Sequence, residues 1–414
     1  MRAVILAAGK GKRLEPLTNT TPKTMLPLAG KPLLEHVLIA LSHAGVEKAT
    51  MVIGYKGDMI KSYFGEEKHG VELEYAVQRE RLGTAHAVAE ADLKEDALVL
   101  NGDTLVSADT IKEVLQCYSR FNPWAVMALL RVENPLSYGA VFLEGDRVEK
   151  LVEKPRENIS PLINAGIYVF SREVLDAFGR TEKSPRGEYE LTSSINLIIR
   201  EGGEVRGVEI KGLWRDVGTP WNYLDANNTA LDLMDERVEG EVEKGATIKG
   251  KVFVGSGTVV RSGSYIEGPV YIGRNCVVGP NAFLRSYTTL GDGCRAGNAV
   301  EIKNSILLDG AKVPHLSYVG DSIIGRGCNL GAGTKVGNLR LDGKEVKMRI
   351  KGELTGTGRR KFGCVLGDNV KTGLNVMINA GRKIGNDSMI GPGVIVYHDV
   401  EPRSFILDRQ RLRD

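Results

Sequence analysis

The sequence has no long apolar run, and none of its hydrophobic stretches approaches the roughly 18 residues that a membrane-spanning helix needs. It also shows no signal peptide, because the chain enters a strand-like segment directly after Met1. Its five cysteines are scattered, odd in number and without a CxxC pair, so they indicate neither a disulfide framework nor a zinc site. We therefore expect a cytoplasmic protein that does not bind membranes.

An excess of one charge is missing as well. Lys and Arg total 55 and Asp and Glu total 52, which gives a formal net charge of +3. This balance provides no global basic surface for nucleic acid, so we expect small-molecule partners and local binding of any anion. At 414 residues the chain exceeds what one hydrophobic core usually fills. Two domains are therefore expected.

The first half alternates short apolar runs with amphipathic stretches, which predicts an α/β domain over residues 1–225 with a Rossmann-like mixed or parallel sheet. Strands are expected near residues 3–6, 50–54, 73–77, 97–100, 125–130, 140–143 and 167–170, and helices near 33–44, 58–64, 84–91 and 195–200. Ligands of open α/β sheets bind beyond the carboxyl ends of the strands. Asp103 follows such a strand and is a candidate site residue.

Around Gly240 the pattern changes, and pairs of an aliphatic or small residue followed by glycine recur, many at six-residue intervals. This period predicts a parallel β-helix over residues 241–414, joined to the first domain by a helical connector at 226–240. A flexible Gly-rich tail would lack the regularly spaced Val, Ile and Leu. One insertion, residues 339–363, breaks the period and carries eight basic residues against three acids, and loops on a rigid scaffold commonly build sites.

The N-terminal segment has the features of a phosphate site. Gly9 and Gly11 follow the first strand, and without a Cβ their backbone can take a positive φ and approach phosphate oxygens closely. Arg13 supplies a cation, and Lys23 stands in a stretch bounded by two prolines that restrict the chain. The segment is neither a P-loop nor a Rossmann fingerprint, because no Gly-Lys-Ser/Thr follows and Leu14 occupies the third glycine position.

Taken together, AAGxGxRL and the following PKxMLPLxGKP resemble the opening of the sugar-1-phosphate nucleotidylyltransferases. Nucleotidyl transfer needs cations on the phosphates and carboxylates that hold Mg²⁺. The resemblance implies catalytic roles for Arg13 and Lys23 and metal binding by Asp103 and Asp216. It implies nucleotide binding by Ala7, Ala8, Gly9, Gly11, Gln78, Gly83 and Thr84. A turn-forming role for Asp103 and helix capping by Thr84 are the structural alternatives.

The resemblance also extends to a sugar-phosphate side. Tyr138-Gly139, Glu153-Lys154 and Asn164-Ala165-Gly166 match the family at this side. They imply sugar-phosphate binding by Gly139, Glu153, Lys154 and Asn164, with Glu153 on sugar hydroxyls and Lys154 on the phosphate. The alternative is a solvated strand edge that carries two ordinary exposed charges.

In the second half, VPHLSYVGD at 313–321 followed by NLGAGT at 329–334 resembles the acetyltransferase domain of bacterial N-acetylglucosamine-1-phosphate uridylyltransferase. That family is bifunctional, and the resemblance covers nearly the whole chain in the same domain order. It implies a left-handed β-helix, acetyl-CoA as co-substrate, and a homotrimer or a multiple of it. It implies His315 as general base, sugar-phosphate binding by Arg285, Lys303, Tyr318 and Asn329, and acetyl-CoA binding by Asn338. Lys344 and Lys347 lie where archaeal relatives place functional lysines.

Two features depart from the bacterial bifunctional pattern. The stretch PLTNTTPKTMLPLAGKP and the Asp at 216 are closer to glucose-1-phosphate thymidylyltransferases, which leaves UTP and dTTP both open as the nucleotide. The bacterial C-terminal coenzyme A segment has no clear counterpart. Basic residues of the C-terminal tail are candidates to replace it, with a solvated tail as the alternative: Arg403, Arg409, Arg411 and Arg413.

The sequence therefore predicts a Mg²⁺-dependent enzyme with two activities. The β-helix acetylates glucosamine-1-phosphate or galactosamine-1-phosphate, and the first domain joins N-acetylglucosamine-1-phosphate to UTP and releases pyrophosphate. One rival is a single-activity glucose-1-phosphate uridylyl- or thymidylyltransferase with a structural or regulatory β-helix. Another is a non-catalytic regulatory subunit of the type found in translation-factor exchange complexes, which need not keep Lys23, Asp103 and Asp216.

Overall fold

The computed structural model describes residues 1–407 and divides into two compact units. The first, unit 1, comprises Met1–Lys10, Pro22–Met25 and Pro32–Asp216. The second, unit 2, comprises Gly11–Thr21, Leu26–Lys31 and the chain from Val217 onward. In the part of the chain that the structure describes, no helix is both long and apolar enough to cross a membrane.

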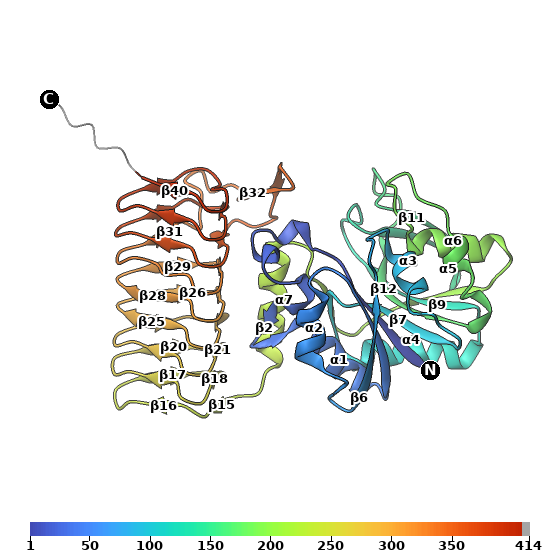
Figure 1. Cartoon of the computed structure of the whole chain (residues 1–414), viewed down its shortest axis with the longest axis horizontal. Helices are drawn as coiled ribbons and strands as arrows, with labels where there is room; N and C mark the ends of the chain where they lie inside the picture. The colour runs from blue at the N-terminus through green and yellow to red at the C-terminus, as the bar shows by residue number, and fades with distance from the viewer. Residues whose placement is uncertain (408–414) are drawn as a thin grey trace. The chain divides into compact units, whose positions relative to one another are not determined.

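Unit 1 is built on a ten-stranded mixed sheet (Figure 1). Across the sheet the strands are β10 (Gly139–Glu144), β11 (Arg147–Glu153), β13 (Val205–Glu209), β9 (Ala125–Arg131), β12 (Leu162–Phe170), β7 (Ala97–Asn101), β1 (Arg2–Ala7), β4 (Lys48–Ile53), β6 (Val71–Val77) and β5 (Glu67–Lys68). Strand β1 pairs in parallel with β4 and β7, whereas β12 is antiparallel to β7 and β9. The expected mixed α/β sheet is confirmed.

Helices pack on both faces of this sheet, which explains why its central strands are continuously apolar. The helices of unit 1 are α1 (Leu33–His43), α2 (Gly57–Phe64), α3 (Thr84–Ala89), α4 (Ala108–Phe121), α5 (Ala177–Arg180) and α6 (Leu191–Arg200). Side chains of β1 alternate between two cores: Ala3 and Ile5 pack with α1 and α4, and Val4 packs with α3 and α6. Short 3-10 turns occur at Lys23–Met25 and Arg172–Val174.

One buried carboxylate ties three elements of unit 1 together. Glu35 on α1 accepts a hydrogen bond from the Tyr63 hydroxyl of α2, and its Oε1 lies 2.9 Å from Nε2 of His69, which follows β5. Burial raises the pKa of Glu35, but the hydrogen bonds from Tyr63 and His69 and the Lys68 charge outweigh it, so the net pKa is lowered. The ionised carboxylate therefore stabilises this corner of the fold.

Most of unit 2 is a parallel β-helix, in which short strands stack in three faces (Figure 1). Face 1 contains β15 (Arg237–Val238), β18 (Val252–Val254), β21 (Val270–Ile272), β24 (Thr288–Leu290), β27 (Ile306–Leu307), β30 (Ile323–Ile324), β34 (Cys364–Leu366) and β37 (Arg382–Ile384). Face 2 contains β16 (Glu241–Val242), β19 (Val259–Val260), β22 (Val277–Val278), β25 (Arg295–Asn298) and β28 (Lys312–His315), and then β35 (Lys371–Thr372), β38 (Met389–Ile390) and β40 (Phe405–Ile406).

Face 3 contains β17 (Thr247–Lys249), β20 (Tyr265–Glu267), β23 (Phe283–Leu284), β26 (Glu301–Lys303), β29 (Tyr318–Gly320), β31 (Lys335–Val336), β36 (Met377–Ile378) and β39 (Ile395–Val396). The aliphatic residue of each hexad points inward and is buried, as Val254, Ile272 and Leu290 show on face 1. Because each coil contacts only its neighbours, these inward residues form one continuous core along the stack.

The insertion leaves the coil as an ordered hairpin. Strands β32 (Lys347–Ile350) and β33 (Glu353–Gly356) pair antiparallel, and a bridge between Leu339 and Lys361 closes the base. Corresponding positions of neighbouring coils are separated by 18 residues at Arg274 and Asp292, but by 42 residues at Arg326 and Asp368. The extra residues at the second step are those of the predicted insertion, so the coil resumes in register beyond it.

Helix α7 (Pro220–Leu233) precedes the first coil, so it begins before the connector expected at 226–240. Thr219 caps it by accepting from the Asn222 N–H, and Pro220 stands at the first helical position. The buried Asn227 side chain accepts from the Ala29 N–H at 3.0 Å and donates to Thr289 Oγ1 at 3.0 Å. Residues 26–31, α7 and face 1 are thereby joined within unit 2.

Candidate active sites

A charged cluster lies at the carboxyl end of β7 in unit 1. Asp103 immediately precedes β8 (Thr104–Val106), and Asp216 ends β14 (Trp214–Asp216), which pairs antiparallel with β8. Lys23 Nζ lies 2.6 Å from Asp103 Oδ2 and 3.9 Å from Asp216 Oδ1. The structure therefore brings together three charged residues that were predicted from the sequence to share one site.

The exposed fractions of these side chains fit a site that binds a charged ligand. The Lys23 side chain is 8 % exposed, whereas that of Asp103 is 34 % exposed. A buried ammonium is stable only when it is paired, and the two carboxylates supply that pairing. Oxygen ligands suit Mg²⁺, which is usually held by one or two carboxylates together with substrate phosphates. Within residues 1–407 no cluster of three or more His, Cys, Asp or Glu residues could hold a metal ion, so a two-carboxylate arrangement is the one available.

The residues at the end of β1 lie beside Gln78. A Cβ added at Gly54 would lie 3.0 Å from Ala8 Cβ and 3.1 Å from the Gln78 carbonyl oxygen, so Ala8 and Gln78 both lie close to this glycine. Ala7 and Ala8 are buried, and Ala8 is held by the Tyr55 N–H. A Cβ added at Gly9 would contact nothing within 4 Å, which leaves open space where a ligand could approach.

The positive φ expected for both loop glycines occurs at only one of them. Gly11 is left-handed with φ of 70°, whereas Gly9 is not among the residues with positive φ. The Gly11 carbonyl oxygen accepts from the Leu14 N–H at 2.9 Å and from Thr18 Oγ1 at 3.0 Å. Gly11 and the half-buried Arg13 belong to unit 2, so the predicted phosphate loop is divided between the two units.

The predicted base-binding residues form a connected group. The buried Gln78 donates from Nε2 to the Gly83 carbonyl at 2.9 Å, and the same nitrogen lies 3.1 Å from His86 Nδ1. Gly83 has φ of 125°, and a Cβ there would lie 2.3 Å from the Tyr189 carbonyl oxygen. The glycine is therefore required by the approach of the chain itself at Tyr189.

Thr84 does not cap its own helix. Gly83 is the N-cap residue of α3, and no side chain caps that end. Instead, Thr84 Oγ1 accepts at 3.0 Å from the backbone N–H of Leu191, the first residue of α6. Thr84 therefore binds the start of α6 and not the start of its own helix, as the capping alternative had assumed. This hydrogen bond joins the base-binding segment to α6.

Three of the residues predicted to bind the sugar phosphate converge. Gly139 pairs with Glu153 across β10 and β11, and a Cβ at Gly139 would lie 3.2 Å from Glu153 Oε2 and 3.5 Å from Asn164 Cβ. The Asn164 amide donates to the Tyr168 hydroxyl at 2.6 Å and accepts from the Gly166 N–H at 3.0 Å, which fixes its orientation. Lys154 Nζ lies 3.6 Å from Glu153 Oε1.

Arg186 and Glu190 complete this cluster, and neither was predicted from the sequence. Arg186 Nη1 lies 2.8 Å from Glu190 Oε1 and 3.3 Å from Glu153 Oε1. Burial, followed by the Glu153 charge, raises the pKa of Glu190. Their spacing of four residues is the signal that could have identified the pair, although it does not reveal Glu153 as a shared partner. Glu153 therefore lies between two cations and is not an ordinary solvated strand edge.

On the β-helix, several predicted acetyl-transfer residues surround one buried carboxylate. Asp321 lies 3.6 Å from Lys303 Nζ and accepts hydrogen bonds from the amides of Asn304 and Asn338. Asn338 also donates to the Tyr318 hydroxyl at 3.1 Å. A pocket of about 290 Å³ opens beside this cluster, lined by Asn228, Glu267, Arg285, Ser286, Tyr287, Lys303, Asn304 and Asp321. Asp321 was not assigned from the sequence.

The other predicted acetyl-transfer residues lie elsewhere on the coil. His315 ends β28 on face 2 and is exposed, and its carbonyl oxygen accepts from Ser317 Oγ at 2.6 Å and from the Gly333 N–H at 3.1 Å. Asn329 bridges Lys312 and Lys371 on face 2 as well. Within a single chain, Asn329 is therefore not on the face that carries Tyr318 and Lys303.

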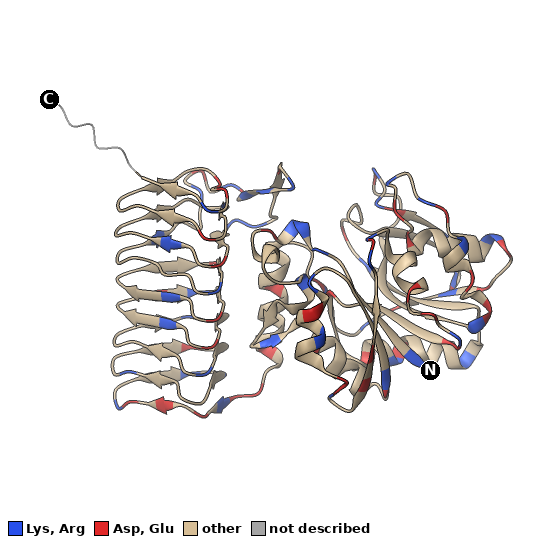
Figure 2. Cartoon of the chain, in the orientation of Figure 1, with Lys and Arg blue, Asp and Glu red and all other residues tan. Residues whose placement is uncertain are grey.

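The insertion is strongly basic, and Figure 2 shows Lys and Arg along the segment around β32. Lys344 and Lys347 are both exposed; the Lys344 N–H donates to Asp342, and Lys347 pairs with Gly356. Arg403 is exposed on the last coil. The other basic tail residues proposed for coenzyme A, Arg409, Arg411 and Arg413, lie outside the described residues.

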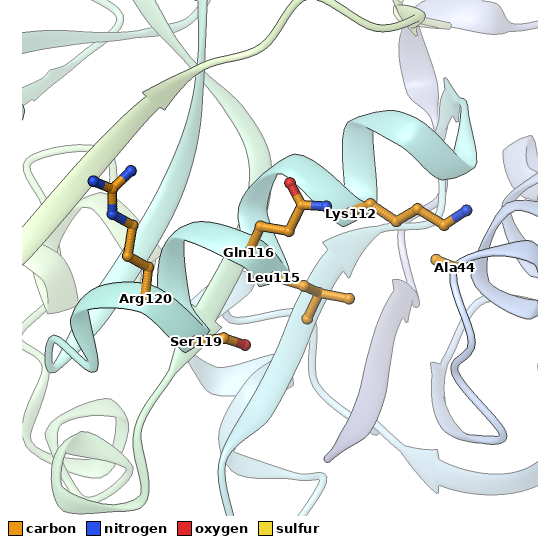
Figure 3. Close-up of a pocket in the computed structure, with 6 residues that line it drawn as sticks. All are labelled: Ala44, Lys112, Leu115, Gln116, Ser119 and Arg120. Carbon is orange, nitrogen blue, oxygen red and sulfur yellow. The ribbon is translucent and has the colours of Figure 1, made fainter.

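A second cavity, which is in unit 1, lies apart from the predicted site residues. It has a volume of about 420 Å³ and is lined by Ala44 and by Lys112, Leu115, Gln116, Ser119 and Arg120 of α4 (Figure 3). None of its lining residues belongs to the predicted sites, and all of its α4 side chains except that of Leu115 are exposed.

Comparison with known proteins matches successive parts of the chain to different families. Residues 2–232 match the nucleotidyl transferase family, residues 242–286 match the bacterial transferase hexapeptide family of six repeats, and residues 266–382 match the GMPPB C-terminal domain. A Methanococcus maripaludis protein named bifunctional protein GlmU is 47% identical over 417 residues, covering 100% of this chain and 98% of that protein. A Sulfurisphaera tokodaii protein named bifunctional sugar-1-phosphate nucleotidylyltransferase/acetyltransferase is 42% identical over 403 residues, covering 97% and 98%.

Solved structures match the first half of the chain. A putative glucose-1-phosphate thymidylyltransferase from Bacillus anthracis in complex with a sucrose has a TM-score of 0.53 and 28% identity, covering 57% of this chain and 98% of that one. A UDP-glucose pyrophosphorylase complexed with UDP-glucose, at 23% identity and a TM-score of 0.52, shows the same fold over 56% of this chain and 99% of that one.

The nucleotidyltransferase fold, the hexapeptide β-helix and the full-length relatives together define a two-domain transferase. The chain belongs to the family of bifunctional sugar-1-phosphate nucleotidylyltransferase/acetyltransferases. This result confirms the predicted bifunctional family, and it favours that prediction over the single-activity and non-catalytic rivals.

Proposed function

We propose that the β-helix transfers the acetyl group of acetyl-CoA to glucosamine-1-phosphate and that unit 1 then joins the product to UTP. The second reaction forms UDP-N-acetylglucosamine and releases pyrophosphate. The observation that carries the proposal is the pairing of the buried Lys23 ammonium with Asp103 and Asp216 at the carboxyl end of the sheet. Such an arrangement of one cation and two carboxylates is what phosphate chemistry with a divalent ion requires.

In nucleotidyl transfer, a phosphate oxygen of the sugar-1-phosphate attacks the α-phosphorus of UTP, and the bond to pyrophosphate breaks. The chain's part is to position the reactants and to neutralise charge. Lys23 and Arg13 act as cations for the triphosphate, and Gln78 and Gly83 hold the base. Gly139, Glu153 and Asn164 hold the sugar, whose phosphate lies by Lys154.

Asp103 and Asp216 would hold Mg²⁺. Both supply carboxylate oxygens, Asp103 just before β8 and Asp216 at the end of the paired strand β14, and Asp103 is sufficiently exposed to share the ion with substrate phosphates. The ion would neutralise charge that develops on the phosphates. Lys23 lies against the same carboxylates and holds them in place before substrate enters.

In acetyl transfer, the sugar amine attacks the thioester carbon, the C–S bond breaks and coenzyme A leaves. The amine must lose a proton, and imidazole is the side chain that most often accepts a proton in general-base catalysis. His315 has this role in our proposal. Asn338 contacts acetyl-CoA, Lys344 and Lys347 support this site, and the sugar phosphate is held by Arg285, Lys303, Tyr318 and Asn329.

We infer that the second site is completed between subunits of a homotrimer or of a multiple of it. The inference is supported by the placement of Asn329 on face 2 and of Tyr318 and Lys303 on face 3. A cyclic arrangement of coils would set face 2 of one subunit beside face 3 of the next. Measurement of the solution mass tests this inference directly.

One experiment tests the proposed function. The protein is incubated with glucosamine-1-phosphate, acetyl-CoA, UTP and Mg²⁺, and the products are identified with each component omitted in turn. Parallel reactions replace UTP with dTTP and glucosamine-1-phosphate with galactosamine-1-phosphate. We expect N-acetylglucosamine-1-phosphate without UTP, and UDP-N-acetylglucosamine and pyrophosphate in the complete mixture. Acetylation without any nucleotidyl transfer, or the reverse, would contradict the proposal.

A further inference from the structure

Unit 2 includes Gly11–Thr21, a segment from the N-terminal part of the chain, in addition to the β-helix and α7. This segment contains two residues of the proposed phosphate site, Gly11 and Arg13, and ends two positions before Lys23. Side chains of the β-helix hold its last residues. These side chains form hydrogen bonds with the segment in addition to packing against it.

Two hydrogen bonds hold Thr20 and Thr21, in addition to the contact between the Asn19 and Asn386 side-chain amides. Arg326 Nη1 donates to Thr21 Oγ1 at 2.7 Å, and Thr20 Oγ1 donates to Asp368 Oδ2 at 2.7 Å. The other carboxylate oxygen of Asp368 accepts from the Arg326 backbone N–H at 2.7 Å, so both bonds depend on one pair of neighbouring coils. Thr21 and Asp368 are 2 % and 6 % exposed, and a buried polar group left without its partner costs about 1–3 kcal/mol.

A second Arg–Asp pair shows how the coil uses these residues elsewhere. The Arg274 N–H donates to Asp292 Oδ1 at 2.8 Å, the same backbone contact that Arg326 makes with Asp368. There the guanidinium returns to the aspartate, with Nη2 at 2.7 Å from Asp292 Oδ2. At Arg326 and Asp368, by contrast, Nη1 of the guanidinium and the second carboxylate oxygen bind the threonines. Nε of Arg326 lies 3.5 Å from Oδ2 of Asp309 on the coil. The contacts with Thr20 and Thr21 are therefore additional to the backbone hydrogen bond that joins the two coils.

We propose that Arg326 and Asp368 of the β-helix are positioning residues for nucleotidyl transfer. By fixing Thr20 and Thr21, they set the direction in which the chain enters Pro22 and Lys23 and hold the segment that carries Arg13. Two residues span at most about 7 Å, and proline restricts φ at Pro22. A shift of the backbone at Thr21 is therefore expected to shift the backbone at Lys23 as well. This inference rests on the proposed function of unit 1.

The test compares both activities in the same preparations of the full-length chain. The variants are Arg326→Met, its conservative partner Arg326→Lys, Asp368→Asn, and Thr21→Val on the other side of the hydrogen bond. We expect Arg326→Met and Thr21→Val to raise the KM for UTP, and for pyrophosphate in the reverse reaction, about tenfold. The KM for N-acetylglucosamine-1-phosphate and the kcat/KM of acetyl transfer stay within twofold. Arg326→Lys restores part of the loss because it keeps a donor near Thr21.

Asp292→Asn is the matched control, since it changes an equivalent coil aspartate that binds no threonine of the segment. If it raises the KM for UTP as much as Asp368→Asn does, the effect is general to the coil and the proposal is wrong. Unchanged UTP kinetics in Arg326→Met and Thr21→Val would also overturn it. Absence of nucleotidyl transfer in the unmodified chain would instead refute the proposed function, so the two failures are distinguishable.

Discussion

The charged cluster of unit 1 gives the most direct test of the proposed chemistry. Replacing Lys23 with Met keeps an unbranched side chain of similar length and removes the ammonium between Asp103 and Asp216. The two carboxylates then face each other without the cation that lies 2.6 and 3.9 Å from them. Both the folded state and the reaction lose a fixed positive charge.

The size of each effect follows from the geometry. At an effective dielectric constant of about 20, a cation about 4 Å from a carboxylate contributes about 4 kcal/mol before the desolvation penalty is subtracted. Breaking a fully buried ion pair costs about 3–5 kcal/mol, and because one third of Asp103 is exposed we expect about 1–3 kcal/mol here. For catalysis, loss of one preorganised charge that stabilises the transition state lowers kcat about 10²- to 10³-fold.

The assay follows kcat for UDP-N-acetylglucosamine formation, the Mg²⁺ concentration at half activity, and acetyl transfer as an internal control. Since Lys23 and Mg²⁺ share the same carboxylates, we expect the Mg²⁺ requirement of Lys23→Met to stay constant or fall while kcat drops. In Asp103→Asn, by contrast, the Mg²⁺ requirement should rise. A Lys23→Met variant with kcat within twofold of the unmodified chain, or one that loses acetylation as well, would refute this reasoning.

Three further predictions concern other parts of the chain. His315→Ala should lower acetyl transfer about 10²- to 10⁴-fold, the usual size of a general-base contribution, and leave uridylyl transfer unchanged; retained acetylation would exclude His315 as the base. Salt should raise the KM for acetyl-CoA or the amino-sugar phosphate, because the basic insertion is exposed and such charges are screened beyond about 8 Å at physiological ionic strength; a flat KM would make the hairpin structural. Because the pKa of Glu35 is lowered in the folded state, its stabilisation is complete above the pKa of the unfolded chain and is lost as pH falls through the pKa of the folded protein. Glu35→Gln should therefore lower the free energy of unfolding at pH 7 by about 1–3 kcal/mol, and by progressively less under acidic conditions. An equal loss of Tm at pH 7 and under acidic conditions would contradict this.

Much of the fold was predictable because its periodicities are strong. The apolar run at residues 3–6 became β1, and the hexads became the coils, since both patterns follow from side chains that must be buried. Helix α4 was not predicted, although Ser107 caps it by accepting from the Thr110 N–H. Strand β14 was also missed, because three residues contain no period and its place depends on pairing with the distant β8.

The site was predictable where the signal is local. Lys23, Asp103 and Asp216 stand in short motifs, and the structure places them together. Arg186 and Asp321 were missed, since their roles depend on neighbours that only the fold supplies. The assignment of Gly11 and Arg13 to the β-helix unit could not be inferred from sequence, because the partners of that segment lie more than 300 residues further along the chain.

That separation has a consequence for how the protein forms during synthesis. Thr20 and Asp368 are 348 residues apart, so the segment leaves the ribosome long before its binding partner exists. Domains generally fold as units from the N-terminus, but bringing together such distant residues must wait for the intervening coils. The sheet of unit 1 can therefore form early, while Gly11–Thr21 stays exposed until the coils around Asp368 have been made. A nascent chain halted before Asp368 should show this segment open to protease, whereas one released after the last coil should show it protected.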